Sequence, residues 1–327
     1  MEGITAVFAC LGAIVGAGFA SGREVMAFFT CYGKHSWWLI AAASAVMGWI
    51  CRLCMRASGA ERDWTQLLGK RSGWMVGLSC CLMLLTGGAM VSAAGHLCAL
   101  MFAGRLAGTA GAVCTLGAAW VMGQKNLKAL GWLSAVLSIM LICVLAGAFR
   151  LPKRTVVLPQ HAFSTGSLVR AVLGAAAYAA MNAMLASGVI CKSSGRYTAA
   201  GVGGMLALLL GLSNGLYLRH PELLNEALPL VALLQKAGRS GFLLSAGLMY
   251  LSVFTTLTAV VCALRTAAQS AAPSPRLGAA LVMGLLLAVS CIGFSEIVDA
   301  LYAPAGLICL AAVFLPLQCR RARQSNA

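Results

Sequence analysis

Acidic side chains are scarce in this sequence, with only eight Asp and Glu among 327 residues. All charged residues together make up 10% of the chain, whereas hydrophobic residues make up 61%. A soluble protein of this length needs far more charge to cover its surface, so the composition excludes an ordinary soluble domain. Apolar stretches of about twenty residues instead predict helices that cross a lipid bilayer.

Patterns for metal binding and catalysis are lacking as well. The fourteen cysteines follow no zinc or disulfide spacing, and most lie in apolar runs, where a thiol behaves as a small hydrophobe. Paired acids, a His-Glu-x-x-His motif and a nucleophile–base set are also lacking. The sequence therefore predicts no enzyme and no resident cofactor. The N-terminus, Met1-Glu2-Gly3, lacks the basic region of a signal peptide.

Basic residues are plentiful, and the formal net charge is +16. They lie in short patches between apolar runs rather than on one basic face, which argues against a nucleic-acid partner. With the N-terminus inside, fourteen Lys and Arg fall in inner loops and nine in outer loops. Because cytoplasmic loops carry the excess of positive charge, both termini are predicted to be cytoplasmic.

Ten apolar segments are long enough to cross a membrane, and backbone hydrogen bonding in lipid permits only helices there. The predicted spans are 4–31, 37–55, 74–102, 107–123, 129–149, 167–191, 198–217, 241–264, 277–294 and 297–317. The fold class is thus an all-α polytopic membrane protein. The interrupted stretch 219–239 predicts a helix lying over the outer face.

Two short sequence matches between the halves of the chain divide these segments into two groups of five. Ala20-Ser21-Gly22 recurs as Ala186-Ser187-Gly188, an offset of 166 residues, and Arg71-Ser72-Gly73-Trp74 recurs as Arg239-Ser240-Gly241-Phe242, an offset of 168. Five spans is an odd number, so the second half enters from the opposite side, as in the inverted repeats of secondary transporters. The predicted divisions are a first repeat (1–149), an outer connection (150–166), a second repeat (167–318) and a basic cytoplasmic tail (319–327).

The first segment contains four glycines in eleven residues, at Gly12, Gly16, Gly18 and Gly22. One interpretation is a helix-packing face, because the spacing fits small-xxx-small pairs. The other is a helix broken around 16–22, because each glycine weakens a helix by about 1 kcal/mol and permits irregular dihedrals. A break exposes amides that bind a carboxylate and carbonyls that bind a cation.

Gly-Ala-Gly-Phe-Ala-Ser-Gly-Arg-Glu at 16–24, followed by Phe28-Phe29 and Tyr32-Gly33, resembles the opening of the YkvI-like bacterial membrane proteins, relatives of the amino acid–polyamine–organocation transporters. The resemblance covers the whole chain through its ten-span layout, but its specific motif lies in the first span. It implies the LeuT-type fold, with two inverted five-helix repeats and spans 1 and 6 unwound at a central site, in the bacterial plasma membrane.

The resemblance also implies site residues. The substrate carboxylate would meet the amides of Ala17 and Gly18 after Gly16, with Phe19 beside it. The sodium site of that fold would use carbonyls of Gly12, Val15 and Ser252 and hydroxyls of Thr255 and Thr256, although the two threonines could simply bond back to their own helix. Proton-coupled relatives replace this ion by a lysine in span 5. No lysine occurs in 129–149, which favours sodium as the coupling ion.

Further polar residues lie within the spans. Tyr178 and Asn182 either contact substrate or form interhelical hydrogen bonds. The offset of 166 residues places Asn182 opposite Gly16, at the start of the second predicted break. Arg23 and Asp299 are a candidate outer gate, with a local pair between Arg23 and Glu24 as the alternative.

The sequence thus predicts a secondary transporter that couples sodium to uptake of a small carboxylate-bearing solute, with an amino acid favoured. The alternative is a non-transporting membrane receptor or structural subunit with the same fold. No particular oligomeric state is predicted.

Overall fold

The computed structural model describes residues 3–14, 16–57, 72–102, 104–123, 127–152, 165–190, 193, 197–271 and 274–316, and this part of the chain contains helices and no strand. The longer helices are α1 (Gly3–Ile14), α4 (Ser36–Ala57), α6 (Ser72–Phe102), α7 (Arg105–Met122), α8 (Leu127–Ala148), α9 (Thr165–Leu185), α11 (Thr198–Tyr217), α13 (Arg239–Ala271), α14 (Pro275–Ser290) and α16 (Tyr302–Cys309). Short helices and turns join them: α2 (Ala17–Ser21), α3 (Arg23–Phe28), η1 (Thr30–His35), α10 (Ser187–Ile190), η3 (Pro221–Leu223), α12 (Pro229–Gln235), α15 (Phe294–Glu296) and the π-helical η4 (Ile297–Leu301) and η5 (Leu310–Phe314).

Six of the described helical stretches are long and apolar enough to cross a membrane. They are Thr30–Arg56, Gly73–Phe102, Leu168–Leu185, Thr198–Tyr217, Arg239–Gln269 and Phe294–Phe314. Three shorter apolar helices, Leu106–Met122, Val136–Ala148 and Pro275–Ser290, fall where further spans were predicted. The expectation of an all-helical chain is confirmed for the described residues, and the long apolar helices are consistent with a multi-pass membrane protein.

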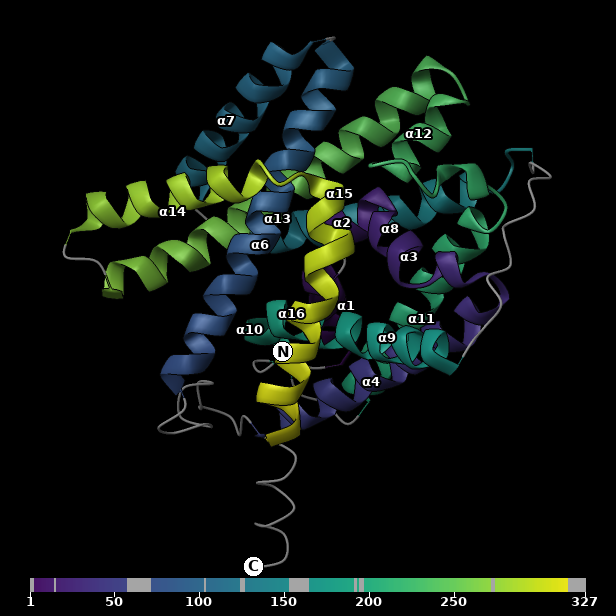
Figure 1. Ribbon diagram of the computed structural model, residues 1–327, viewed down its shortest axis with the longest axis horizontal. Coiled ribbons are helices and arrows are strands. Elements are labelled where there is room, and N and C mark those ends of the chain that lie inside the picture. The colour runs from purple at the N-terminus through teal and green to yellow at the C-terminus, as the bar shows by residue number, and fades with distance from the viewer. Residues whose placement is uncertain are drawn as a thin grey trace, which may run out of the picture.

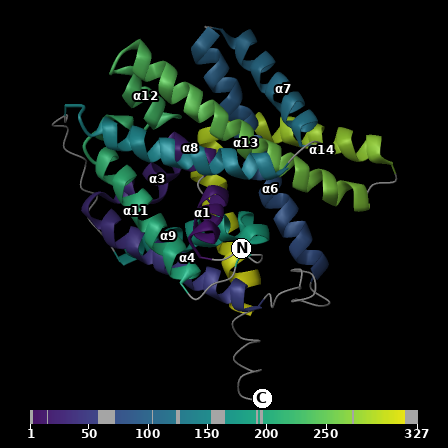
Figure 2. The ribbon, with the colours of Figure 1, turned by 180° about the vertical axis from the view of Figure 1, so that it is seen from behind.

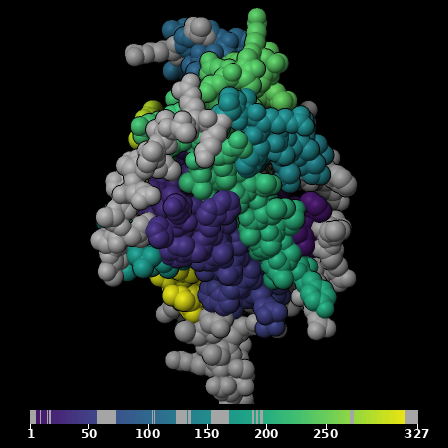
Figure 3. Space-filling model, turned by 90° about the vertical axis from the view of Figure 1, so that its right-hand side faces the viewer, coloured from purple at the N-terminus to yellow at the C-terminus, as the bar shows by residue number. Residues whose placement is uncertain are grey.

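The helices pack in two groups (Figure 1). One, the bundle, contains α1, α4, α9 and α11, in which α4 packs against both α9 and α11 and α1 packs against α11. The other, the scaffold, contains α6, α7, α13 and α14, in which α6 contacts each of the other three. Figure 3 shows α4 and α11 side by side on one face of the molecule.

Close backbone approaches hold both groups together. In the scaffold, a Cβ on Gly95 of α6 would lie 2.9 Å from the carbonyl oxygen of Gly108 in α7. In the bundle, a Cβ on Gly203 of α11 would lie 2.9 Å from the carbonyl oxygen of Ser44 in α4. Helices that lack a hydrophobic driving force in lipid associate through such small-residue contacts.

The broken first segment lies between the two groups, and Figure 2 shows α1 in the middle of the molecule. α1 contacts α8, α9 and α11, whereas α2 contacts α13 of the scaffold and α12. α3 returns to the bundle, where it contacts α9 and α11, and it also touches η4. Residues 3–28 therefore contact both the bundle and the scaffold.

One predicted break is displaced. The break of the sixth span was expected to begin at Asn182, but α9 continues through Asn182 to Leu185, and the interruption falls at Ala186, before α10. Ala177, Ala179, Ala180 and Ala183 surround Tyr178 and Asn182 in the sequence, and a run of alanine sustains a regular helix there. The tail 319–327 and most of the connection 150–166 lie outside the described residues.

Candidate functional site

The chain departs from helical geometry twice in the first segment. α1 ends at Ile14, and Gly16 has an extended conformation (φ −87°, ψ −170°) before α2 begins at Ala17. Gly22 then takes φ +84°, in the left-handed region, between α2 and α3. A glycine is required at this second point because a Cβ would both strain the backbone and overlap the Tyr217 hydroxyl.

Ser21 stabilises the turn between α2 and α3. Its hydroxyl donates to the carbonyl oxygen of Gly18 at 2.6 Å and accepts the Arg23 amide at 3.0 Å, so it satisfies the first free amide of α3. Phe19, on the same short helix, is buried. α2 is therefore a fixed five-residue helix between two interruptions, rather than a frayed end.

Glu24 is the site residue that the sequence interpretation missed. Its side chain is 5% exposed and folds back over α2, where a Cβ on Gly18 would overlap its Oε1 atom. The predicted alternative of a local pair with Arg23 does not form, because Arg23 points to Asp299 instead. The sequence did contain a signal, since an acid is expensive at membrane depth and acids are rare in this chain.

Aromatic and hydroxyl groups surround Glu24. It interacts electrostatically with Tyr178 of α9 and Tyr302 of α16, and Thr86 of α6 lies beside Tyr302. The side-chain oxygens of Tyr178, Tyr302 and Thr86 are buried and have no partner with hydrogen-bonding geometry. Such orphaned polar atoms are costly in a packed interior, which marks this as a place for a polar ligand.

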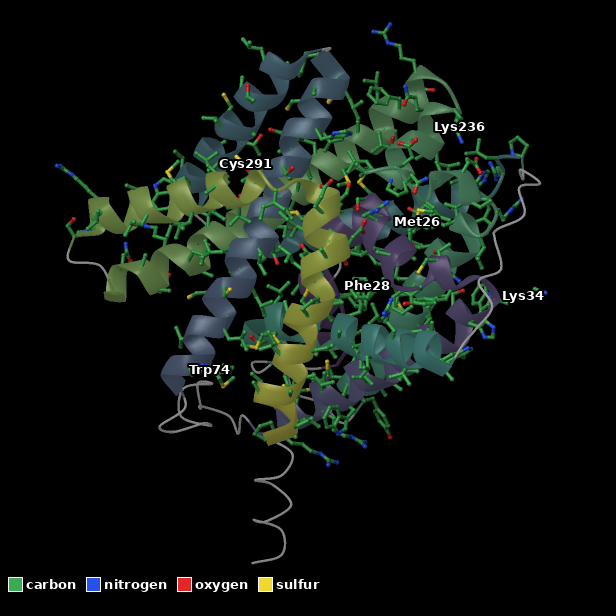
Figure 4. The ribbon with its side chains drawn as sticks, viewed as in Figure 1. Met26, Phe28, Lys34, Trp74, Lys236 and Cys291 are labelled. Carbon is green, nitrogen blue, oxygen red and sulfur yellow. The ribbon has the colours of Figure 1, made fainter. Side chains whose placement is uncertain are left out.

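The Tyr178 ring is held by its neighbours. Phe28 and Phe29 contact it with ring centroids 5.5 and 5.2 Å away, the second edge-to-face. In Figure 4, Phe28 lies in the middle of the molecule, whereas Lys34 and Trp74 lie at its edges. The Asn182 side chain is buried and donates to the Tyr178 carbonyl oxygen at 3.0 Å, so its amide is used within its own helix.

The residues predicted to hold sodium come together only in part. A Cβ on Gly16 would lie 3.4 Å from Thr256 Oγ1, so α13 brings Thr256 against the first interruption. Thr255 is buried and its hydroxyl donates to the Ser252 carbonyl oxygen at 3.0 Å, which leaves its lone pairs available. Gly12 lies within α1, and Val15 lies outside the described residues. The described donors are neutral oxygens, the type that a hard cation prefers.

Arg23 and Asp299 contact each other. The Arg23 Nε donates to Asp299 Oδ1 at 3.0 Å, and a second contact joins Arg23 Nη2 and Asp299 Oδ2. Arg23 Nη1 also donates to the carbonyl oxygens of Leu224 at 2.6 Å and Glu226 at 3.2 Å. One guanidinium thus ties α3, η4 and the connection 219–239 together on the side of the break away from α1.

The connection 219–239 contains two short helices, η3 and α12, instead of the single helix that was predicted over this face. His220 is buried, with its Nδ1 3.5 Å from Glu222 Oε1, and Lys236 donates to that same oxygen at 2.8 Å. Burial lowers the pKa of His220. Burial also raises the pKa of Glu222, but the hydrogen bond and charge of Lys236 outweigh this, so that pKa lies below its ordinary value.

Two open cavities border this connection. One is lined by Glu222, Leu223, Glu226 and Lys236, and the other lies between α6, Leu228 and α15. Neither includes Glu24 or the orphaned hydroxyls. No protein-family model matches this chain, and the comparison with curated proteins gives no match.

Proposed function

We propose that this chain is a secondary active transporter, which couples sodium to the uptake of an amino acid or similar small carboxylate-bearing solute by alternating access. We place it in the bacterial plasma membrane with both termini cytoplasmic and describe its architecture as ten spans in two inverted repeats. The resemblance of 16–33 to the YkvI-like proteins motivates the proposal. The observation that carries it is the double interruption of the first segment between bundle and scaffold.

The pattern of helix contacts supports the inverted repeat. If α1, α4, α6, α7 and α8 correspond in order to α9, α11, α13, α14 and α16, contacts should recur with the halves exchanged. The pair α4·α9 has its counterpart in α11·α1, the pair α6·α14 in α13·α7, and the pair α1·α8 in α9·α16. A pseudo-twofold axis relating the halves produces this kind of exchange.

Alternating access needs a site closed at one side, and the Arg23 contacts supply a closure. The Arg23 side chain is 13% exposed and the Asp299 side chain 39%, so the pair lies at the rim. An ion pair there is worth about 1 kcal/mol or less, which is small enough to open and close in each cycle. We therefore propose Arg23 and Asp299 as the outer gate, with the connection 219–239 as its cover.

The coupling ion would be held where α13 meets the first interruption. Thr256, Thr255 and the Ser252 carbonyl would hold it from α13, and Gly12 and Val15 from the first segment. A sodium ion there would tie the bundle to the scaffold, and this link couples ion binding to solute binding. Thr258, on the same helix, donates to the Phe254 carbonyl oxygen at 2.7 Å and serves as a matched control.

The test is thermal stability of purified protein with amino acids, in sodium and in potassium. Stabilisation that needs sodium supports symport, because a ligand that binds only the folded state raises its stability. Thr256→Val should abolish the sodium effect and sodium-driven uptake into proteoliposomes, whereas Thr258→Val should keep both. Stabilisation by amino acids without any uptake would favour the receptor alternative. No response to any amino acid in either salt would count against the substrate class.

A further inference from the structure

The proposed function leaves one buried charge unused. Glu24 is 5% exposed, and among the described residues no hydrogen bond or ion pair reaches its carboxylate. The neighbouring cation, Arg23, is already bound to Asp299 and to two carbonyl oxygens. An unpaired carboxylate in an apolar interior is strongly unfavourable, so the position calls for a positively charged partner.

Two hydroxyls lie near this carboxylate, from α9 and α16, and a third, on Thr86 of α6, lies beside Tyr302. Tyr178 is fully buried, Tyr302 is 2% exposed and Thr86 is 6% exposed. The Tyr178 hydroxyl has no partner, and the neighbouring Tyr302 and Thr86 hydroxyls form no hydrogen bond of good geometry. The two tyrosines interact electrostatically with Glu24. Glu24 of α3, which lies against Gly18, therefore has the hydroxyls of Tyr178 of α9 and Tyr302 of α16 near its carboxylate.

We propose that Glu24, with the hydroxyls of Tyr178 and Tyr302, binds the protonated amino group of the transported solute. An ammonium group has three donors and no acceptor, which matches one carboxylate and two hydroxyl oxygens. This inference rests on the proposed function and narrows its substrate class, because a carboxylate-bearing solute without an amino group would leave Glu24 unpaired.

The position of Glu24 suits an α-amino acid. Its carboxylate lies against Gly18, one of the two residues whose amides are proposed to hold the substrate carboxylate. The amino and carboxylate groups of an α-amino acid are bonded to the same carbon atom, so they can contact Glu24 and the start of α2 at the same time. The glycine is what allows this approach, because a Cβ on residue 18 would overlap Glu24 Oε1.

A proton on Glu24 is the competing account. A neutral carboxyl group donates one hydrogen bond and accepts others, so it would satisfy the hydroxyls but would leave no group to recognise the amino group of the solute. The proposed sodium site has its own neutral oxygens, including Thr256 next to the first interruption at Gly16, whereas Glu24 lies against Gly18. The ammonium group of a solute would neutralise the Glu24 carboxylate and donate to the tyrosine hydroxyl oxygens at the same time.

The experiment measures the thermal stability of the purified full chain against alanine, leucine and phenylalanine, each beside its deaminated acid and its decarboxylated amine. The wild type should be stabilised by the amino acids, more weakly by the amines, and not by the acids. Glu24→Gln keeps the shape and removes the charge, and it should weaken the apparent affinity for amino acids about 10- to 100-fold. Tyr178→Phe and Tyr302→Phe should each weaken it about 5-fold. Glu296→Gln, at an exposed acid of α15, is the matched control and should bind as the wild type does.

Several outcomes would overturn the inference. They are a wild type stabilised by none of the amino acids and amines, a wild type that binds deaminated acids as well as amino acids, and a Glu24→Gln variant that keeps its amino-acid affinity. If that variant binds normally but its uptake loses pH dependence, the carboxyl carries a proton instead, and the proposal falls. A further outcome separates the two proposals. If amines stabilise the wild type, Glu24→Gln abolishes this stabilisation and no uptake is measured, then the binding site is supported and the transport function is excluded.

Discussion

The carboxylate of Glu24 occupies the space where a Cβ of residue 18 would lie, six residues earlier in the chain and across the left-handed turn at Gly22. This contact folds α3 back toward α2 and places an acid beside the interrupted helix. It links the two unusual features of the first segment, its glycines and its buried charge, in one arrangement.

Gly18→Ala should displace the Glu24 side chain, because the added Cβ would overlap Oε1. The obstacle is the end of a flexible side chain, so the fold should survive while amino-acid affinity falls at least 10-fold. A double-mutant cycle checks the cause. In a Glu24→Ala background, adding Gly18→Ala should cost little further stability or affinity, because the overlapping atoms are gone. Equal effects of Gly18→Ala in both backgrounds would contradict a direct contact.

Gly22→Ala should be more damaging than Gly238→Ala. Both glycines have positive φ, +84° and +102°, and an alanine forced to positive φ costs about 1–2 kcal/mol. A Cβ at 22 would also overlap the Tyr217 hydroxyl, whereas nothing lies within 4 Å of a Cβ at 238. Thermal unfolding of the two variants separates backbone strain from steric overlap. Similar losses of stability would show that the Tyr217 contact has no energetic weight.

Asp299→Asn should change uptake more than stability. It removes a partly exposed ion pair worth about 1 kcal/mol or less, whereas the bonds of Arg23 to Leu224 and Glu226 remain. Arg23→Gln removes all of these contacts and should affect uptake more strongly. A charge-swapped pair, Arg23→Asp with Asp299→Arg, should recover only part of the uptake, because the swapped arginine starts from η4 and not from α3. Full independence of uptake from both residues would exclude a gate here.

The sequence predicted the all-α fold class and most helix positions, because long apolar runs and loops rich in Lys and Arg are strong local signals. The glycine spacing of the first segment also predicted a broken helix, as one of two interpretations beside a helix-packing face. The position of the second interruption was wrong. The offset of 166 residues between two short sequence matches placed Asn182 opposite Gly16. The alanine-rich run around Asn182 keeps this part of α9 helical, and the interruption falls at Ala186 instead.

That Glu24 and not Arg23 turns inward could not be deduced from the two neighbouring residues alone. Arg23 and Glu24 are neighbours, and a local pair is the simplest interpretation of two opposite charges in sequence. Which one points inward depends on the backbone turn at Gly22 and on the carbonyls of Leu224 and Glu226, some two hundred residues away. Burial of the acid follows from these long-range contacts.

Acidification should loosen the connection 219–239. The pKa of His220 is lowered by burial, so the folded chain resists a proton that the unfolded chain accepts near pH 6.5. Folded stability from this residue is therefore present above that pH and lost as the pH falls below it. The pKa of Glu222 is lowered too, so its contribution is lost at still lower pH, below about 4.5. Glu222 raises the pKa of His220, but burial together with the positive charges of Lys236 and Arg219 outweighs it. The hydrogen-exchange protection factors of 219–239, which correct for the slower intrinsic exchange in acid, should fall between pH 7 and pH 5.5 in the wild type. In His220→Gln they should vary much less over that interval. An unchanged pH response in the variant would assign the effect to another group.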